Sequence, residues 1–426
     1  MFRLENAQSL VGIALTLLVC WGLSEDRKRF PWRLAIGALV IQVALVVGLF
    51  LFKPGQAVVT WLSSGVDGLA AATAQGTQFV FGYLGGGEQP YLQSAPRAPF
   101  VFAFQVLPLI LVISALSALL WHWQILKWII RGFGFLFEKT MGMGGASATA
   151  TAANIFVGMV ETPIIIRAYL DKLTRSELFL MMVVGLATVA GSTMVAYATV
   201  LKDVLPHAAA HVIVASVVSA PAGVLLARLM IPEKKGEGGV NVDYTSLLKY
   251  ESSIDAISKG TADGLMVVLN ISAILIVFVA LVAVGNGILG ILPDVGGAPL
   301  TIERILGVVF APLAWCMGVD WAESGKAGYL LGVKLMLTEF IAFIQLGAIP
   351  AGEMSERTRM IMTYALCGFA NVGSVGITVS GMGILMPERR AEIIGMVWKA
   401  LLAGFLATCM TAAVVGAMPR ELFGIQ

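Results

Sequence analysis

Two glutamates in the middle of apolar segments are the residues of this sequence with the most evident chemistry. Glu161 lies within NIFVGMVETPIIIRAYL, and Glu339 lies within GYLLGVKLMLTEFIAFIQLG. A carboxylate at the centre of a bilayer costs about 2.5–3.5 kcal/mol on translocon-insertion scales, so such residues face a polar site instead of lipid. The apolar arm on either side of each glutamate is too short to cross a bilayer. We therefore predict two re-entrant hairpins, each with a glutamate near its tip.

The segments that follow the two hairpins share one pattern. GLATVAGSTMVAY begins at Gly185 and GFANVGSVGITV begins at Gly368, so Thr188 and Asn371 take corresponding positions. Small and polar residues at membrane depth predict broken helices, whose free ends present N–H and C=O groups to a ligand and a coupling cation. Two such halves are typical of a secondary transporter built from inverted repeats. The substrate is then expected where the hairpin tips meet.

The elements that must position these residues are transmembrane helices. Of the 426 residues, 58% are hydrophobic and only 13% are charged, with a mean hydropathy of +0.87, which identifies an integral membrane protein. Apolar runs of about 20 residues predict an all-α fold with about eight transmembrane helices in addition to the two hairpins. The runs lie near residues 8–24, 34–52, 100–121, 177–201, 207–230, 262–285, 360–386 and 391–417.

Basic residues set the predicted orientation. They cluster in EDRKRFPWR after the first run, in residues 127–139 after the third, in ARLMIPEKK at the end of the fifth and in PERR before the last. The positive-inside rule places these clusters in the cytoplasm, so both termini lie outside it and the hairpins enter from opposite sides. Residues 54–86 and 122–141 are predicted to be interfacial helices. Residues 232–260 are predicted to be a cytoplasmic linker that ends in a short surface helix.

Composition and motifs argue against several other classes of protein. A formal net charge of +2 without a basic stripe indicates no nucleic-acid partner. The four cysteines lie apart in apolar runs without a CxxC pair, which indicates neither disulfides nor a zinc site. His207 and His211 have i, i+4 spacing but no third ligand, so we interpret them as surface residues. No cofactor is expected.

Several motifs, taken together, resemble the concentrative nucleoside transporter family over nearly the whole chain. They are LSEDRKRFPWR, NIFVGMVETP with IRAYL, GLATVAGST, PLAWCMGVDW, TEFIAF, and ALCGFANVGSVGI with PERR. The resemblance implies a homotrimer in the cell membrane that imports nucleosides with sodium or a proton as coupling ion. It also implies a transport domain that moves like an elevator against a scaffold. We assign residues 1–143, 206–300 and 389–426 to the scaffold, and residues 144–205 and 301–388 to the transport domain.

The resemblance also assigns roles to individual residues. It places the ribose against Glu339, Asn371 and Ser374, with Phe369 packing nearby. These side chains suit a ribose, because a carboxylate accepts hydrogen bonds from vicinal hydroxyl groups and an amide both accepts and donates them. A sodium site is implied at the first hairpin and the first helix break, built from Asn154, Val157, Thr188 and Val189.

The base-recognition hairpin departs from the family pattern. The resemblance places the base near Glu161 and Thr193, where the usual Gly-Gln-Thr-Glu motif supplies two polar contacts. This chain has Met159 and Val160 in their place, so two hydrogen bonds to the base are missing. Base selectivity is therefore open, and a modified nucleoside or related ribosyl compound is an alternative substrate. Thr338 also stands where the family commonly has asparagine before the second glutamate.

These residues could also have purely structural roles. The two glutamates could pair with basic residues, Asn371 and Ser374 could join helices, and Asn154 and Thr188 could cap them. A receptor that binds a nucleoside without moving it is another class of function. An intramembrane enzyme is a third, but no nucleophile or HExxH motif accompanies the glutamates. The repeat favours a cation-coupled nucleoside importer.

Overall fold

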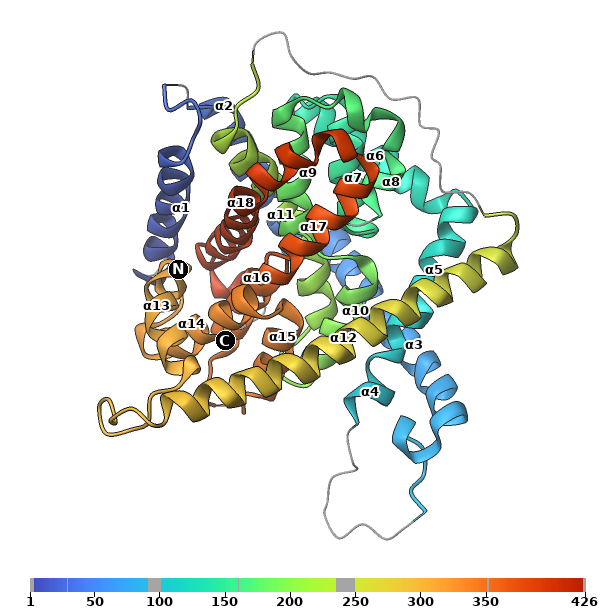
Figure 1. Ribbon diagram of the computed structural model, residues 1–426, viewed down its shortest axis with the longest axis vertical. Coiled ribbons are helices and arrows are strands. Elements are labelled where there is room, and N and C mark those ends of the chain that lie inside the picture. The colour runs from blue at the N-terminus through green and yellow to red at the C-terminus, as the bar shows by residue number, and fades with distance from the viewer. Residues whose placement is uncertain are drawn as a thin grey trace.

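The computed structural model describes residues 4–28, 30–90, 101–159, 161–234, 250–350 and 352–423. Within these ranges every regular element is a helix, and the extended pairing is limited to an isolated bridge between Val295 and Ala298. This confirms the predicted all-α fold (Figure 1). The peripheral and terminal elements are α1 (Leu4–Gly22), α2 (Trp32–Phe50), α3 (Lys53–Phe81), η1 (Gly82–Gly85), α4 (Phe102–Gln105), α5 (Pro108–His122), α6 (Ile125–Met141), α12 (Ser253–Leu289), α13 (Ile302–Cys316), η3 (Pro387–Arg389) and η4 (Arg420–Phe423).

Six helical segments in the described part of the chain are long and apolar enough to cross a membrane. Two further predicted spans appear in other forms. Helix α1 is a shorter apolar helix, and the predicted span at 360–386 is divided into two helices. The six segments are Trp32–Phe50, Phe102–His122, Arg175–Leu201, Ala208–Met230, Ser253–Leu289 and Pro387–Gly416.

The first half contains the first predicted hairpin and a broken helix. Helix α7 (Gly145–Phe156) forms the first arm of the hairpin, and α8 (Thr162–Ile165) and η2 (Arg167–Lys172) form the second arm. Small residues allow α7 to be buried along almost its whole length. At the turn, Gly158 has a φ of +112°, a conformation that L side chains rarely adopt. The following span is broken into α9 (Arg175–Ala187) and α10 (Gly191–Leu201).

The second half repeats this arrangement. Its hairpin consists of α14 (Trp321–Met336) and α15 (Glu339–Ala348), and its broken helix of α16 (Glu356–Leu366) and α17 (Val372–Leu385). The Thr338 side chain caps α15 by accepting a hydrogen bond from the Ile341 N–H. The two helix breaks touch directly, since the Phe369 N–H donates to the Thr188 carbonyl at 3.2 Å.

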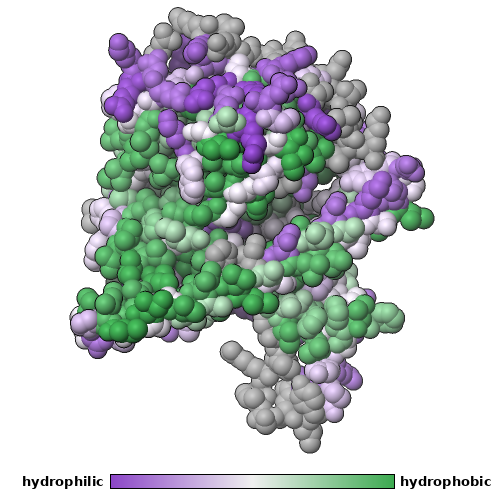
Figure 2. Space-filling model, viewed as in Figure 1, coloured by the Kyte–Doolittle hydropathy of each residue, from purple (hydrophilic) through white to green (hydrophobic). Residues whose placement is uncertain are grey.

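Two long helices fill the space between the halves, and one long helix lies outside them. Helices α11 (Ala208–Met230) and α18 (Arg390–Gly416) are largely buried and pack against α9 and α16. Helix α12, by contrast, crosses the outside of the bundle (Figure 1), where its 18-residue apolar window has no buried residue. Apolar side chains cover most of the lower part of this face, whereas polar ones gather at the top of the molecule and at the N-terminal end of α12 (Figure 2). The predicted short surface helix before this span is wrong, because α12 begins at Ser253 and continues without a break.

Arg359 joins the second hairpin to the broken helix beside it. Its guanidinium donates to the carbonyls of Leu346 (3.1 Å), Ile349 (2.8 Å) and Pro350 (2.6 Å) at the end of α15, and to Met354 (3.3 Å). The last carbonyls of a helix have no partner within the helix, so this buried cation satisfies groups that would otherwise be lost. Hairpin and broken helix are thereby fixed to each other.

Replacing Arg359 by Met should therefore lower the unfolding temperature of the detergent-solubilised protein by several degrees. Hydrogen bonds to a charged group contribute about 1.5–3 kcal/mol, and buried carbonyls would be left without donors. The control is Arg304→Met, which also removes bonds to three carbonyls, but in an exposed loop where water replaces them. Equal unfolding temperatures for the two variants would contradict this role.

Candidate functional site

The carboxylate of Glu339 is the centre of the candidate site. It is the first residue of α15, where the helix dipole favours a negative charge, and it is only 5% exposed. Tyr197 donates its hydroxyl to Oε1 at 2.8 Å, and Asn371 donates its amide N–H to Oε2 at 2.9 Å. A carboxylate has about four acceptor positions. Each oxygen therefore retains capacity for a further donor, such as a sugar hydroxyl.

Asn371 and Ser374 are positioned by the second helix break. Asn371 caps α17, and its Oδ1 accepts the Ser374 backbone N–H at 2.8 Å. This bond fixes the amide, so its NH₂ group points to Glu339. Both residues are buried, and Phe369 is half-buried two residues before the cap. The structure thus joins three of the four predicted ribose residues, Glu339, Asn371 and Ser374, through hydrogen bonds. The fourth, Phe369, lies two residues before Asn371 at the same helix break.

Tyr197 is a member of this site that the sequence interpretation missed. It lies on α10, so it reaches Glu339 from the opposite half of the molecule. Its fully buried ring stacks on Phe343, with centroids 4.3 Å apart, and meets Phe340 edge-on at 5.4 Å. The sequence feature that could have identified it is a tyrosine among small residues just after the first helix break.

Lys334 is a second residue that was missed. It is completely buried on α14, and its ammonium donates to the Ala365 carbonyl at 2.7 Å and to the Thr408 hydroxyl at 2.6 Å. The sequence also contained the feature that could have identified it, because a lysine in the apolar arm GVKLML needs a buried polar partner.

The predicted sodium residues lie together at the first helix break. Asn154 is 1% exposed, and neither its Oδ1 nor its Nδ2 has a hydrogen-bond partner among the described residues. The Thr188 hydroxyl lies 2.8 Å from the Val184 carbonyl and 3.2 Å from the Asn154 carbonyl, so its single proton is shared between these acceptors. The Val189 backbone follows immediately, and Val157 ends the same hairpin arm as Asn154. Amide, hydroxyl and carbonyl oxygens suit a hard cation, and a buried amide without partners indicates that one fits here.

The base side of the site is built on the first hairpin. A Cβ placed on Gly185 would lie 2.9 Å from the Met159 Cβ, so Met159 packs closely on α9. Glu161 is exposed at the start of α8, and its Oε2 would lie 3.1 Å from a Cβ on Gly158. Thr193 is buried one helical turn before Tyr197, so α10 connects the base side with Glu339. Val160 lies outside the described residues.

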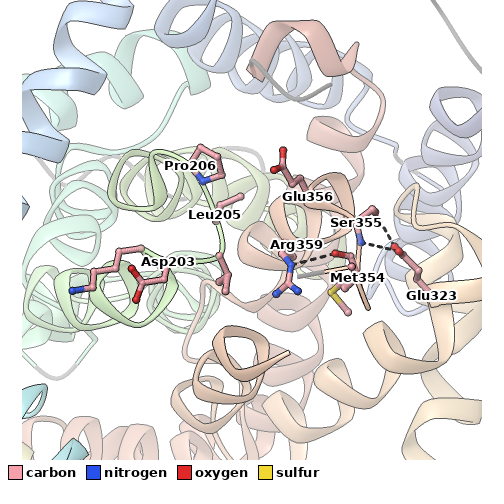
Figure 3. Close-up of a pocket in the computed structure, with 11 residues that line it drawn as sticks. Asp203, Leu205, Pro206, Glu323, Met354, Ser355, Glu356 and Arg359 are labelled. Carbon is pink, nitrogen blue, oxygen red and sulfur yellow. Dashed lines mark hydrogen bonds between the residues drawn. The ribbon is translucent and has the colours of Figure 1, made fainter. Parts of the chain in front are cut away.

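A cavity of about 510 Å³ lies elsewhere, beside the far ends of α10 and α16 (Figure 3). Arg359 lines it, but its guanidinium is bonded to backbone carbonyls. The lining residues include none of those at the hairpin tips, and we assign the cavity no ligand. Its walls comprise Lys202, Asp203, Val204, Leu205, Pro206, Glu323, Gly352, Met354, Ser355, Glu356 and Arg359.

The interpretation of both histidines as surface residues is wrong for one of them. His211 is 2% exposed, its Nδ1 lies 3.2 Å from the Tyr364 hydroxyl, and its ring stacks on Phe50 at 4.9 Å. His207 is exposed and precedes α11. Packing of α11 against α16 buries His211, which a spacing argument could not reveal. Among the described residues, no group of three or more His, Cys, Asp and Glu side chains could hold a metal ion.

Two hairpins, two broken helices and a shared buried carboxylate define a membrane transporter with two similar halves. Three family profiles match the chain: "Na+ dependent nucleoside transporter N-terminus" over residues 11–84, "Nucleoside recognition" over 103–204, and "Na+ dependent nucleoside transporter C-terminus" over 211–416. The chain belongs to the Na⁺-dependent nucleoside transporter family. Membership of this family confirms the resemblance and identifies the protein as a transporter, not an enzyme.

Relatives and solved structures agree with this assignment. Nucleoside permease NupC of Helicobacter pylori is 35% identical over 421 residues, which cover 96% of each chain. Sodium/nucleoside cotransporter 1 of Rattus norvegicus is 33% identical over 438 residues, covering 97% of this chain and 64% of that protein. CNTnw in an inward-facing substrate-bound state has 36% identity and a TM-score of 0.86, covering 97% of this chain and 99% of that chain.

Replacing Glu339 by Gln should reduce nucleoside binding at least a hundredfold. An amide oxygen is a weaker acceptor for sugar hydroxyls than a carboxylate, and its NH₂ group would face the donors of Tyr197 and Asn371. Equilibrium binding of labelled uridine to the purified protein measures this. The variant Glu356→Gln makes the same change at an exposed glutamate that also begins a helix, and it serves as the control. Wild-type affinity in Glu339→Gln would show that the Glu339 carboxylate does not bind the nucleoside.

Replacing Tyr197 by Phe should weaken uridine binding by about three- to thirtyfold, because one hydrogen bond to a charged group is lost while the ring still packs. The same binding assay measures the change. Tyr329→Phe, on α14, is the matched control and should bind like wild type. Identical affinities for both variants would show that the Tyr197 hydroxyl does not orient Glu339.

Proposed function

We propose that this protein is a sodium-coupled nucleoside importer of the cell membrane. The observation that carries the proposal is the buried Glu339 carboxylate, which receives one donor from each half of the molecule and retains acceptor capacity for a ribose. Asn371 and Ser374 complete the ribose side. The base lies against Met159, Val160, Glu161 and Thr193 of the first half. Sugar recognition thus depends on polar groups, and base recognition depends partly on apolar contact.

The residues at the first helix break fit sodium better than a proton as the coupling ion. The unpartnered amide of Asn154 beside the Thr188 hydroxyl offers oxygen ligands, and Val157 and Val189 can add carbonyls. A proton needs a titratable group, and none of these four residues titrates. The rat relative is a sodium/nucleoside cotransporter by name, which supports the same ion.

Transport is proposed to occur by an elevator movement within a homotrimer, with both termini outside the cytoplasm. Structures of CNTnw in inward-facing and outward-facing states support two end states for this fold. The moving body contains residues 144–205 and 301–388. Because α11 and α18 pack between α9 and α16, we extend the moving body to include these two helices. The exposed α12 then belongs to the scaffold.

Uptake of labelled uridine into proteoliposomes tests the function. We expect accumulation driven by an inward sodium gradient at zero membrane potential, and none driven by a proton gradient alone. Accumulation driven only by a proton gradient would show that the coupling ion is a proton, while the protein would still be a nucleoside transporter. Saturable binding without uptake or counterflow would instead establish the receptor interpretation.

The apolar residues of the first hairpin favour a modified nucleoside or related ribosyl compound as a second candidate substrate. Met159 packs against Gly185, so the base meets a thioether where a polar group is usual. Restoring polarity with Met159→Gln and Val160→Thr should strengthen uridine uptake several-fold relative to nucleosides with apolar base substituents. Competition by a panel of nucleosides measures this ratio. An unchanged order of competition would place the two positions outside the base pocket.

A further inference from the structure

Lys334 in the second half corresponds by position to Asn154 in the first half. Asn154 stands two residues before the end of the hairpin arm α7 at Phe156, and Lys334 stands two residues before the end of α14 at Met336. Each arm continues into a helix-terminating residue, Val157 or Leu337, before the hairpin returns. The two polar side chains therefore occupy equivalent places in the repeat.

Each position also lies beside a helix break. The backbone carbonyl of Asn154 lies 3.2 Å from the Thr188 hydroxyl at the first break, whereas the Lys334 side chain itself donates to the Ala365 carbonyl near the end of α16, before the second break. In each half the long helix after the break adds a hydroxyl. Ser216 of α11 binds the Val189 N–H at 3.3 Å. Thr408 of α18 binds the Lys334 ammonium.

The difference between the two places is one of charge. At the first, the buried amide of Asn154 has no partner among the described residues, which fits an exchangeable cation. At the second, an ammonium already lies against the carbonyl end of α16, where a helix favours a cation. Phe405 lies 5.4 Å from that ammonium and adds a cation–π contact. The direct hydrogen-bond partners of Lys334 are neutral, so its balancing charge must come from elsewhere.

Glu339 supplies that balancing charge. It stands five residues later, across the hairpin turn from Lys334, and both side chains are buried near the tip of the same hairpin. The carboxylate proposed to bind the ribose therefore receives two neutral donors directly and one positive charge through space.

We propose that Lys334 is a tethered cation, which permanently fills in the second half the position that the cotransported sodium ion takes in the first, and which positions the Glu339 carboxylate for the substrate. This inference rests on the proposed function, because it takes the Asn154 site as the sodium site. It follows that one sodium ion completes the site, since the second cation position is already filled by the chain itself.

The test compares Lys334→Asn and Lys334→Met by uridine binding at varied sodium, with choline keeping ionic strength constant. Asn restores the amide found in the first half, whereas Met can hold no ion. We expect Lys334→Asn to lose about tenfold in affinity at low sodium and to recover at high sodium, with the apparent number of sodium ions rising from about one to about two. Lys334→Met should stay weak at every concentration.

Lys326→Met is the matched control, since Lys326 lies on the same helix but is half exposed and pairs with Glu353. It should behave like wild type. Wild-type binding without any sodium dependence would refute the proposed coupling ion before a variant is compared. Given sodium-dependent wild-type binding, the inference is overturned if both Lys334 variants keep the wild-type sodium curve, or lose affinity equally with an unchanged sodium number.

The reciprocal variant Asn154→Lys keeps the inference falsifiable if the Lys334 variants do not fold. It places a tethered ammonium in the first half, so uridine binding should persist and lose its dependence on sodium. Binding that retains the wild-type sodium dependence would overturn the proposal. Thermal unfolding of each purified variant, measured alongside, separates loss of binding from loss of fold.

Discussion

The structure depends on the burial of one carboxylate, that of Glu339. An ionised group removed from water is tolerated only when its oxygens are hydrogen-bonded and its charge is balanced. Here Tyr197 donates from α10 and Asn371 from the cap of α17, and Lys334 is buried on α14 of the same hairpin. These elements must converge on one point within the apolar bundle. Continuous transmembrane helices could not bring their ends there, so the hairpins and helix breaks follow from this requirement.

The same constraint explains the unusual glycines. A Cβ on Gly368 would lie 2.6 Å from the Thr408 side chain and 2.9 Å from the Ala187 carbonyl, and one on Gly185 would collide with Met159. Both positions of the repeated Gly-x-Ala-x-Val pattern therefore permit close approach beside a break. The Phe369 to Thr188 bond holds the two breaks together. The proposed substrate and cation sites are thus joined by a direct backbone contact.

The sequence was informative where a residue is costly in lipid. The paired glutamates, the small-residue breaks and the hydropathy predicted the hairpins and most spans, and motif resemblance led to the family. Tyr197 and Lys334 were missed, although Lys334 is itself costly, because their roles depend on partners distant along the chain, 142 residues away for Tyr197 and Glu339. His211 was misplaced for the same reason. The roles of Met159, Glu161 and the sodium residues stay predictions, because they concern molecules that the chain alone does not contain.

The most direct test of the central claim is an experimental structure of the protein with uridine and sodium bound. The account predicts ribose hydroxyl oxygens within hydrogen-bond distance of the Glu339 carboxylate and the Asn371 amide, with the base toward Met159. A nucleoside bound in the cavity beside Lys202 and Arg359, with Glu339 contacted only by the protein, would contradict it.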